Sequence, residues 1–357
     1  MDIDVDVGMP QGRRDLMNKW ISLFLAFFFL GAMGNAAPST KRPALQLRLF
    51  GNYGKLPSGD LNEDIKSHDQ IYRDLAEIDN SGTLSGGHQL SSQGFGGGVD
   101  LLFGLSDRLS LGLGFEHLRK NKTDTQSLRT DLDERSFQAM ERSIRHLLAT
   151  TGILLKLNYR LPLSQTVSLF ADLGAGLFIT SVDHDLDWTG NYEFWGVGRY
   201  LDSSGVRQNG SFKFLHGQWT QSDLITFTKS KIGWTGGLGI EFSVSKTIGL
   251  FLEGKARFLK LEAPAAQESF DFHETWQETV ILADLRNWKS YDTRETWEQE
   301  GPLSLYDFTS ADTKKNYTFA TANVEELEKD PDNSNFRPAV INLTGFQVRL
   351  GIRIALF

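Results

Sequence analysis

The last sixteen residues of the chain, 342–357, constrain its fold more than any other stretch. From Phe346 to Leu356 the large apolar residues share one parity, while Arg349 and Arg353 lie on the other. Because side chains alternate between the two faces of a strand, this stretch predicts a β-strand with one apolar and one polar face. A soluble sheet would bury the apolar face in a core. A membrane barrel would turn that face to the lipid.

Seven further stretches alternate in the same way, which gives eight candidate strands in total. Glycine recurs inside these stretches and is not collected in a linker, which is typical of strands that curve or pack closely. The seven stretches are 44–53, 93–105, 108–118, 146–160, 166–181, 224–244 and 247–259.

The connections between these strands alternate strictly between long and short. Three of them are tight turns, and the other four are the insertions 54–91, 119–142, 182–222 and 260–341. Outer-membrane barrels have short periplasmic turns and long extracellular loops. With an even strand count and both termini on the periplasmic side, every long connection falls outside the cell. We therefore expect an all-β fold: a transmembrane antiparallel up-and-down β-barrel of about eight strands, spanning 37–357, with long extracellular loops.

The N-terminus predicts a secretory signal peptide over residues 1–36. Basic residues precede the apolar run 20–33, and the small residues Gly34, Asn35 and Ala36 follow it. The run is shorter than the roughly 20 apolar residues that a membrane-spanning helix needs. Cleavage is expected after residue 36 or 37, and translation starts at either residue 1 or residue 17. An uncleaved anchor is the alternative interpretation.

A final aromatic residue after an alternating strand resembles the terminal assembly signal of bacterial outer-membrane barrels, although Phe357 lies on the opposite parity from Phe346. In topology the chain is similar to the small eight-stranded barrels of the OmpA, OmpX and OmpW type. This resemblance implies a place in the outer membrane of a Gram-negative bacterium. It also implies contact with membrane lipid and lipopolysaccharide, and recognition of the last strand by the barrel-assembly machinery. A soluble ligand-binding barrel is the alternative, but it would leave the charged parity in water.

Composition narrows the function classes. The net charge of -8 argues against a nucleic-acid-binding protein, which needs a basic surface. The absence of cysteine excludes disulfides and thiolate metal sites. No cofactor is expected.

The inward parity of the predicted barrel collects five acids and six bases. An eight-stranded barrel is just wide enough for side chains to fill, and buried charges must be paired. We therefore expect a structural or surface-binding protein whose lumen is plugged by a charged network centred on Arg349 and Arg353. A narrow channel for small or apolar solutes is the alternative. The network comprises Arg48, Asp100, Glu116, Lys156, Asp172, Glu241, Glu253, Lys255, Arg257, Arg349 and Arg353.

A third hypothesis is a lipid-modifying barrel enzyme. Its candidate residues are His117, His146 and the cluster 183–187, which reads Asp-His-Asp-Leu-Asp. Nucleophilic catalysis needs a hydroxyl or thiol beside a base that a third group orients, and no distinctive spacing indicates such a set. The same cluster offers ligands for a divalent cation but lacks the spacing of a calcium loop, so a solvated loop is preferred. We predict no enzyme and no metal site.

The insertions carry two further signals. Residues 60–78 have helical periodicity and are expected to form a surface helix over a loop. The last insertion repeats Glu-Thr-Trp at 274–276 and 295–297, which suggests a hairpin, and it contains the aromatic residues Phe270, Phe272, Trp288 and Tyr306. These aromatics either recognise an extracellular protein or glycan, or cap the barrel mouth.

Overall fold

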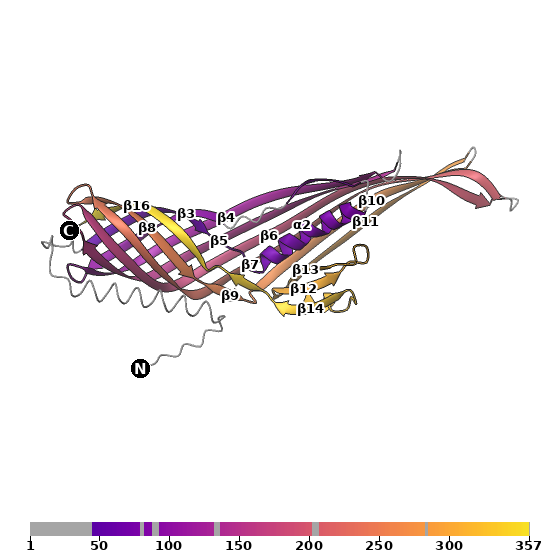
Figure 1. Ribbon diagram of the computed structural model, residues 1–357. Helices are drawn as coiled ribbons and strands as arrows, with labels where there is room; N and C mark the ends of the chain where they lie inside the picture. Colours follow the sequence, from indigo (N-terminus) through magenta and orange to yellow (C-terminus); the bar gives the residue numbers. More distant parts are fainter. Residues whose placement is uncertain are drawn as a thin grey trace.

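In the computed structural model, eight strands form a closed antiparallel ring (Figure 1). The structure describes residues 45–78, 82–87, 93–131, 136–201, 207–282 and 285–356, so the predicted signal peptide and Phe357 lie outside it. The ring consists of β1 (Leu45–Lys55), β3 (Gln93–Gly104), β4 (Leu109–Asp131), β5 (Phe137–Pro162), β6 (Val167–Leu201), β7 (Arg207–Ser243), β8 (Ile248–Phe258) and β16 (Gly345–Ala355).

The last strand closes the ring, as predicted. β16 pairs with β1, where Leu47 lies opposite Ile354, and on its other side it pairs with β8. β8 in turn pairs with β7, so each strand of the ring has two neighbours. The predicted eight-stranded barrel is therefore confirmed.

The outer surface of this ring is apolar. Leucine, isoleucine and phenylalanine side chains of the outward parity are about half exposed, among them Leu113, Leu155 and Leu350. An outward apolar surface of this extent is unfavourable in water, whereas a membrane barrel requires it because lipid surrounds it.

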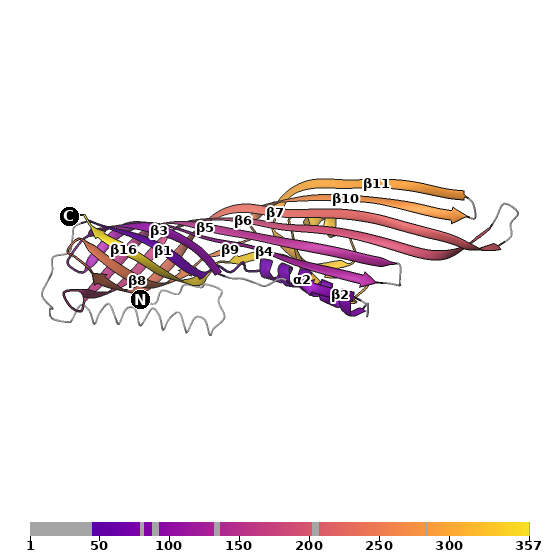
Figure 2. The same cartoon turned by 90° about the horizontal axis from the view of Figure 1, so that it is seen from above.

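Four strands continue far beyond the ring. β4, β5, β6 and β7 contain 23, 26, 35 and 37 residues, whereas a tilted strand crosses a membrane in about 9–11. They join β10 (Ala265–Leu282), β11 (Leu285–Pro302) and β2 (Gly82–Gly86) in one extended sheet (Figure 2). The expected loops 119–142 and 182–222 are thus largely strands. We call the part of the sheet beyond the ring, including β2, β10 and β11, the extracellular sheet.

One face of the extracellular sheet is covered by α2 (Leu61–Ile78) and by a small lobe (Figures 1 and 2). The helix forms where it was predicted, with Glu63 and Lys66 exposed on one face. Leu61 and Tyr72 on the other face are fully buried, so the helix packs on the extracellular sheet and the lobe and not on a loop. Among the described residues no helix is long and apolar enough to span a membrane. The lobe contains β12 (Ser304–Thr309), β13 (Asn316–Thr321), α3 (Val324–Leu327) and β14 (Asn333–Pro338). Two short strands, β9 (Lys260–Glu262) before the β10–β11 hairpin and β15 (Val340–Asn342) after the lobe, pair with each other.

Candidate functional site

The lumen of the barrel contains all eleven charged residues that the parity argument selected. Each is at most 3% exposed. Each of the eight strands of the ring contributes at least one of them. The set is Arg48, Asp100, Glu116, Lys156, Asp172, Glu241, Glu253, Lys255, Arg257, Arg349 and Arg353.

Arg349 lies at the centre of one group of lumen charges. Its guanidinium contacts Glu116, lies 3.3 Å from Glu253 Oε2 and lies 3.8 Å from Asp100 Oδ2. Lys255 Nζ approaches the same Glu116 carboxylate at 2.8 Å. Three carboxylates therefore share two cations here, and the cations of a second group complete the charge balance.

That second group forms around Arg48. Its two terminal nitrogens lie 3.4 Å from Asp172 Oδ2 and 3.4 Å from Glu241 Oε2. Lys156 joins the groups, because its Nζ lies 2.5 Å from Asp100 Oδ2 and 3.4 Å from Asp172 Oδ2.

Two of the predicted residues lie at the ends of the network. Arg353 approaches Glu241 Oε1 with its Nε at 2.9 Å, away from the carboxylates around Arg349. Arg257 donates to the backbone carbonyl of Leu343 at 3.1 Å. The shared centre that the sequence suggested for Arg349 and Arg353 is therefore divided between two groups.

Aromatic rings that the sequence analysis did not select fill the space between the guanidinium groups. Phe50, Phe170 and Phe251 form a buried cluster inside the lumen. The Arg48 guanidinium lies 4.3 Å from the Phe170 ring centroid, and that of Arg349 lies 4.1 Å from the Phe50 centroid. A guanidinium over a ring face gains cation–π attraction while remaining out of water. All three phenylalanines lie on the inward parity, so the alternation of the sequence already indicated that their side chains face the lumen.

Glycine makes room for the longest lumen side chains. A Cβ on Gly114 would collide with the Lys156 side chain at 2.8 Å, and one on Gly237 would collide with the Glu253 carboxylate. The glycines inside the strands thus allow several large charged groups to occupy one narrow lumen.

An apolar cluster, which we call the cap, fills the extracellular end of the lumen. Strand residues such as Leu118, Leu154 and Phe178 meet residues of the covering segments in one continuous buried cluster. The covering segments contribute Leu56, Leu61, Leu303, Leu305, Ile341 and Leu343. The lumen therefore has two layers: a charged network, and an apolar layer outside it.

A buried polar array crosses the cap. Lys120 Nζ donates to Ser58 Oγ at 2.6 Å, and that oxygen lies 2.7 Å from His146 Nε2. His146 Nδ1 lies 3.3 Å from His184 Nδ1, and His184 Nε2 lies 2.8 Å from Asp64 Oδ2. All five residues are at most 5% exposed. The array thus connects β4, β5 and β6 with α2 and the segment before it.

The pKa values of three array residues are shifted from their ordinary values. Burial, with the neighbouring His184 and Lys120, lowers the pKa of His146 well below its ordinary value. Burial, with Lys122, lowers the pKa of Lys120 to about 8. Burial alone would raise the pKa of Asp64, but the neighbouring His68 and the hydrogen bond from His184 hold it well below its ordinary range. Asp64 is therefore anionic and His146 neutral at pH 7.

The structure separates the histidines that the sequence analysis considered. His146 and His184 meet in the array, together with Ser58 and Asp64, which sequence reasoning did not connect with them. His117 lies apart, with its Nδ1 2.9 Å from Thr151 Oγ1. The other acids of the cluster 183–187 lie on the opposite face, where Asp185 pairs with an arginine. Among the described residues no three His, Asp or Glu side chains are arranged to hold a metal ion.

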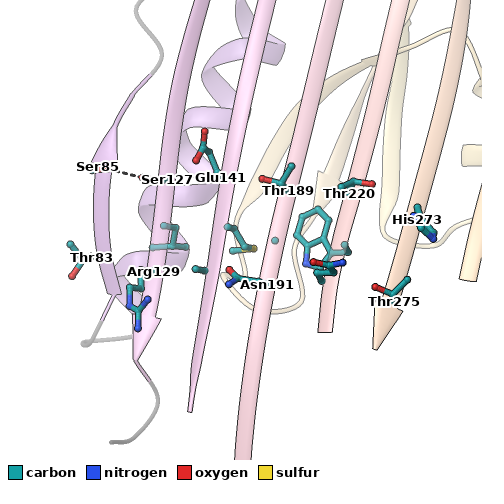
Figure 3. A pocket seen from close by; sticks show the side chains of 16 residues that line it. Thr83, Ser85, Ser127, Arg129, Glu141, Thr189, Asn191, Thr220, His273 and Thr275 are labelled. Carbon is teal, nitrogen blue, oxygen red and sulfur yellow. Dashed lines mark hydrogen bonds between the residues drawn. The ribbon is translucent and has the colours of Figure 1, made fainter. Parts of the chain in front are cut away.

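The uncovered face of the extracellular sheet is polar and contains a shallow trough (Figure 3). The trough has a volume of about 710 Å³ and crosses strands from β2 to β10. Ser85 and Ser127 hydrogen-bond across its first two strands at 2.7 Å. Its lining is dominated by hydroxyl and amide side chains: Thr83, Ser85, Ser127, Thr189, Asn191, Gln218, Thr220 and Thr275.

The predicted hairpin with the repeated Glu-Thr-Trp is β10 and β11. The tryptophan of each repeated phrase stacks on an aromatic residue of the opposite strand. The ring centroids of Trp276 and Tyr291 lie 3.7 Å apart, and those of Phe270 and Trp297 lie 5.3 Å apart. Such cross-strand pairs stabilise a long hairpin.

A closed antiparallel ring with an apolar exterior and a polar lumen defines a transmembrane β-barrel of the bacterial outer membrane. The family model of the outer membrane protein beta-barrel domain matches residues 22–275, and the chain belongs to this family. No similar sequence was found among curated proteins.

Two solved structures show weak likeness to this chain. The crystal structure of CarO from Acinetobacter baumannii is 13% identical, with 88% of this chain and 97% of that chain covered and a TM-score of 0.23. A FadL homologue from Pseudomonas aeruginosa is 8% identical, with 89% and 94% covered and a TM-score of 0.15. These identities and TM-scores are too low to assign a function to this chain.

Proposed function

We propose that this protein is a non-conducting outer-membrane barrel that presents its extracellular sheet as a binding surface. The observation that carries the proposal is the double filling of the lumen, by the network around Arg349 and Arg48 and by the cap above it. An ion crossing this path would have to displace paired charges and then enter an apolar layer, and both steps are unfavourable.

Planar-bilayer recording tests the closed lumen. The purified protein is expected to give no discrete conductance steps at neutral pH. Glu253→Gln together with Arg349→Gln removes one acid and one base from the lumen without changing its net charge, and the cap should still prevent conduction. Reproducible steps from the unaltered protein, changed in size by these substitutions, would overturn the proposal in favour of a narrow channel.

The trough is the part of the sheet that we propose binds ligand, and a neutral glycan fits it best. Hydroxyl and amide groups both donate and accept hydrogen bonds, which matches the hydroxyl groups of a sugar, and the acids and bases nearby are largely paired. Arg294, for example, binds Asp271 at 2.8 Å. In the outer membrane, the polysaccharide of lipopolysaccharide surrounds a sheet in this position.

Binding of fluorescently labelled O-chain polysaccharide tests the trough. Thr189→Tyr fills it and should weaken binding by about tenfold, equivalent to about 1.4 kcal/mol. Thr123→Tyr changes an exposed residue of the same face that does not line the trough, so it should bind like the unaltered protein. Equal affinity of all three proteins would exclude the trough.

A lipid-modifying enzyme is the second candidate, because Ser58, His146, His184 and Asp64 have the contacts of an activated serine. Its weakness is that Ser58 has no exposed surface. Expression with Ser58→Ala set against the unaltered chain, followed by mass spectrometry of lipid A, distinguishes the two. We expect identical lipid A profiles, and a change that depends on Ser58 would favour the enzyme.

A further inference from the structure

The ends of the polar array determine the direction of every hydrogen bond in it. The Lys120 ammonium only donates, and the Asp64 carboxylate only accepts. Ser58, which accepts from Lys120, therefore donates its hydroxyl proton to His146 Nε2. His146 then donates from Nδ1 to His184 Nδ1, and His184 donates from Nε2 to Asp64. In this arrangement each imidazole donates one hydrogen bond and accepts one, and every bond is satisfied.

One added proton disrupts this order. A protonated imidazole has two donors and no acceptor. A proton on His146 removes the acceptor of the Ser58 hydroxyl and places a second cation beside the Lys120 ammonium. This change leaves a mispaired group inside the cap, where water does not compensate for it.

We propose that the array is an acid-sensitive latch: it holds α2 and the segment before it in the extracellular mouth, and acidification outside the cell releases them. The proposal rests on the closed lumen described above and adds that the closure is reversible. Its position supports this role, because Ser58 and Asp64 belong to the covering segment while Lys120, His146 and His184 belong to the strands. Breaking the array therefore weakens the attachment of the cover to the barrel.

Charged and titratable groups approach the array from every element packed around it. α2 contributes Asp64 and His68, and the strands and lobe contribute further groups. These are Lys120 and Lys122 of β4, Arg142 of β5, His184 and Asp185 of β6, Asp223 of β7, Glu268 of β10 and Tyr306 of β12.

The pKa of His146 is shifted in the direction that acid release requires. Since burial lowers the pKa of His146 below its value in the unfolded chain, about 6.5, its contribution to stability is present above that pH and is lost below it. Asp64 has a lowered pKa, so its contribution is lost only below about 3.8. Burial raises the pKa of Asp223 and of Glu268, so they favour the closed form as pH falls.

A single introduced cysteine reports the release, because the natural chain has none. Ala320 is buried beside the array, and its backbone N–H donates to Asp64 Oδ1 at 2.9 Å. We would measure maleimide labelling of Ala320→Cys at about pH 7.5 and about pH 5, each divided by the rate of the same unfolded chain at that pH. This ratio should rise at least ~tenfold on acidification.

Three variants make the test specific. Ala171→Cys, buried in the barrel wall, should stay protected at both pH values, which separates cap release from global unfolding. His146→Gln should abolish the acid response, because the amide replaces the ring nitrogen and does not titrate. His117→Gln should retain it. A response that is absent from the unaltered array, that persists in His146→Gln or that is matched by Ala171→Cys would overturn the latch.

The same samples distinguish this proposal from the proposed function. Conductance at neutral pH would contradict the closed lumen, whatever the labelling shows. A silent protein at neutral pH whose labelling does not respond to acid would contradict the latch alone. Reaction of a fluorophosphonate probe with Ser58 at neutral pH would show an accessible nucleophile, and would overturn the latch in favour of catalysis.

Discussion

The same four strands build two regions with opposite surfaces. Within the membrane, β4 turns Leu111, Leu113 and Phe115 outward and charged residues inward. Beyond it, without any change of register, β4 turns Thr123 and Thr125 outward and buries Leu128. The reversal follows from the surroundings: lipid outside the barrel is replaced by water, and the lumen is replaced by an apolar contact with α2 and the lobe.

The two regions also differ in how they bury charge. In the lumen, the guanidinium groups of Arg48 and Arg349 each face several carboxylates and an aromatic ring at once. In the extracellular sheet, Arg294 and Asp271 form one exposed pair. Water and salt weaken the exposed pair, whereas the lumen charges depend on one another.

Removing Arg349 should have the largest effect on the barrel. Arg349→Met leaves Glu116 and Glu253 without their shared cation in a buried site, and the expected cost is about 3–5 kcal/mol. Guanidinium unfolding of the protein in detergent, followed by gel mobility, measures this cost. A loss below about 1 kcal/mol would show that the lumen admits water and that the network is not essential.

Introducing arginine on the outward face should affect stability differently in the two regions of β4. Leu113→Arg places a charge in lipid and should cost about 2–4 kcal/mol. Asn121→Arg, on the same strand and parity but beyond the apolar surface, should change stability by less than about 0.5 kcal/mol. The same unfolding assay in lipid vesicles measures both free energies of unfolding. Equal losses for the two variants would mean that the outward face of β4 does not change from lipid to water between Leu113 and Asn121.

Replacing a lumen ring should have a smaller effect. Phe170→Leu keeps an apolar side chain but removes the ring under the Arg48 guanidinium, for an expected cost of about 1–2 kcal/mol. Phe242→Leu, on the lipid-facing side, serves as the control and should cost less. An equal loss at both positions would assign the effect to size alone.

The smallest effect is expected at the exposed pair of the extracellular sheet. Arg294→Ala should lower stability less than any of the changes above, and the loss should shrink further as the salt concentration rises. Unfolding measured at low and high salt tests this. A larger cost that salt does not change would mean that the two regions bury charge alike.

Much of the barrel followed from the sequence alone. Alternation determined which residues face the lumen, because a strand has only two faces and lipid accepts only one kind of side chain. The lengths of the connections determined the strand order. For the same reason, the position of each lumen charge on its strand was predictable, although its partner was not.

Partners were decided by the tilt and register of the closed ring. Arg349 meets Glu116 although 233 residues separate them, and only closure of the barrel brings their strands to one level. Ser58 and Asp64 of the covering segment, His146 of β5 and His184 of β6 likewise come from three separate stretches. Where the strands leave the lipid the rule of alternation reverses, so 119–142 and 182–222 resembled polar loops. The terminal strand could indicate a barrel by itself, but only the tertiary structure places α2 and the lobe over its mouth, because their contacts depend on surfaces that do not exist until the ring has closed.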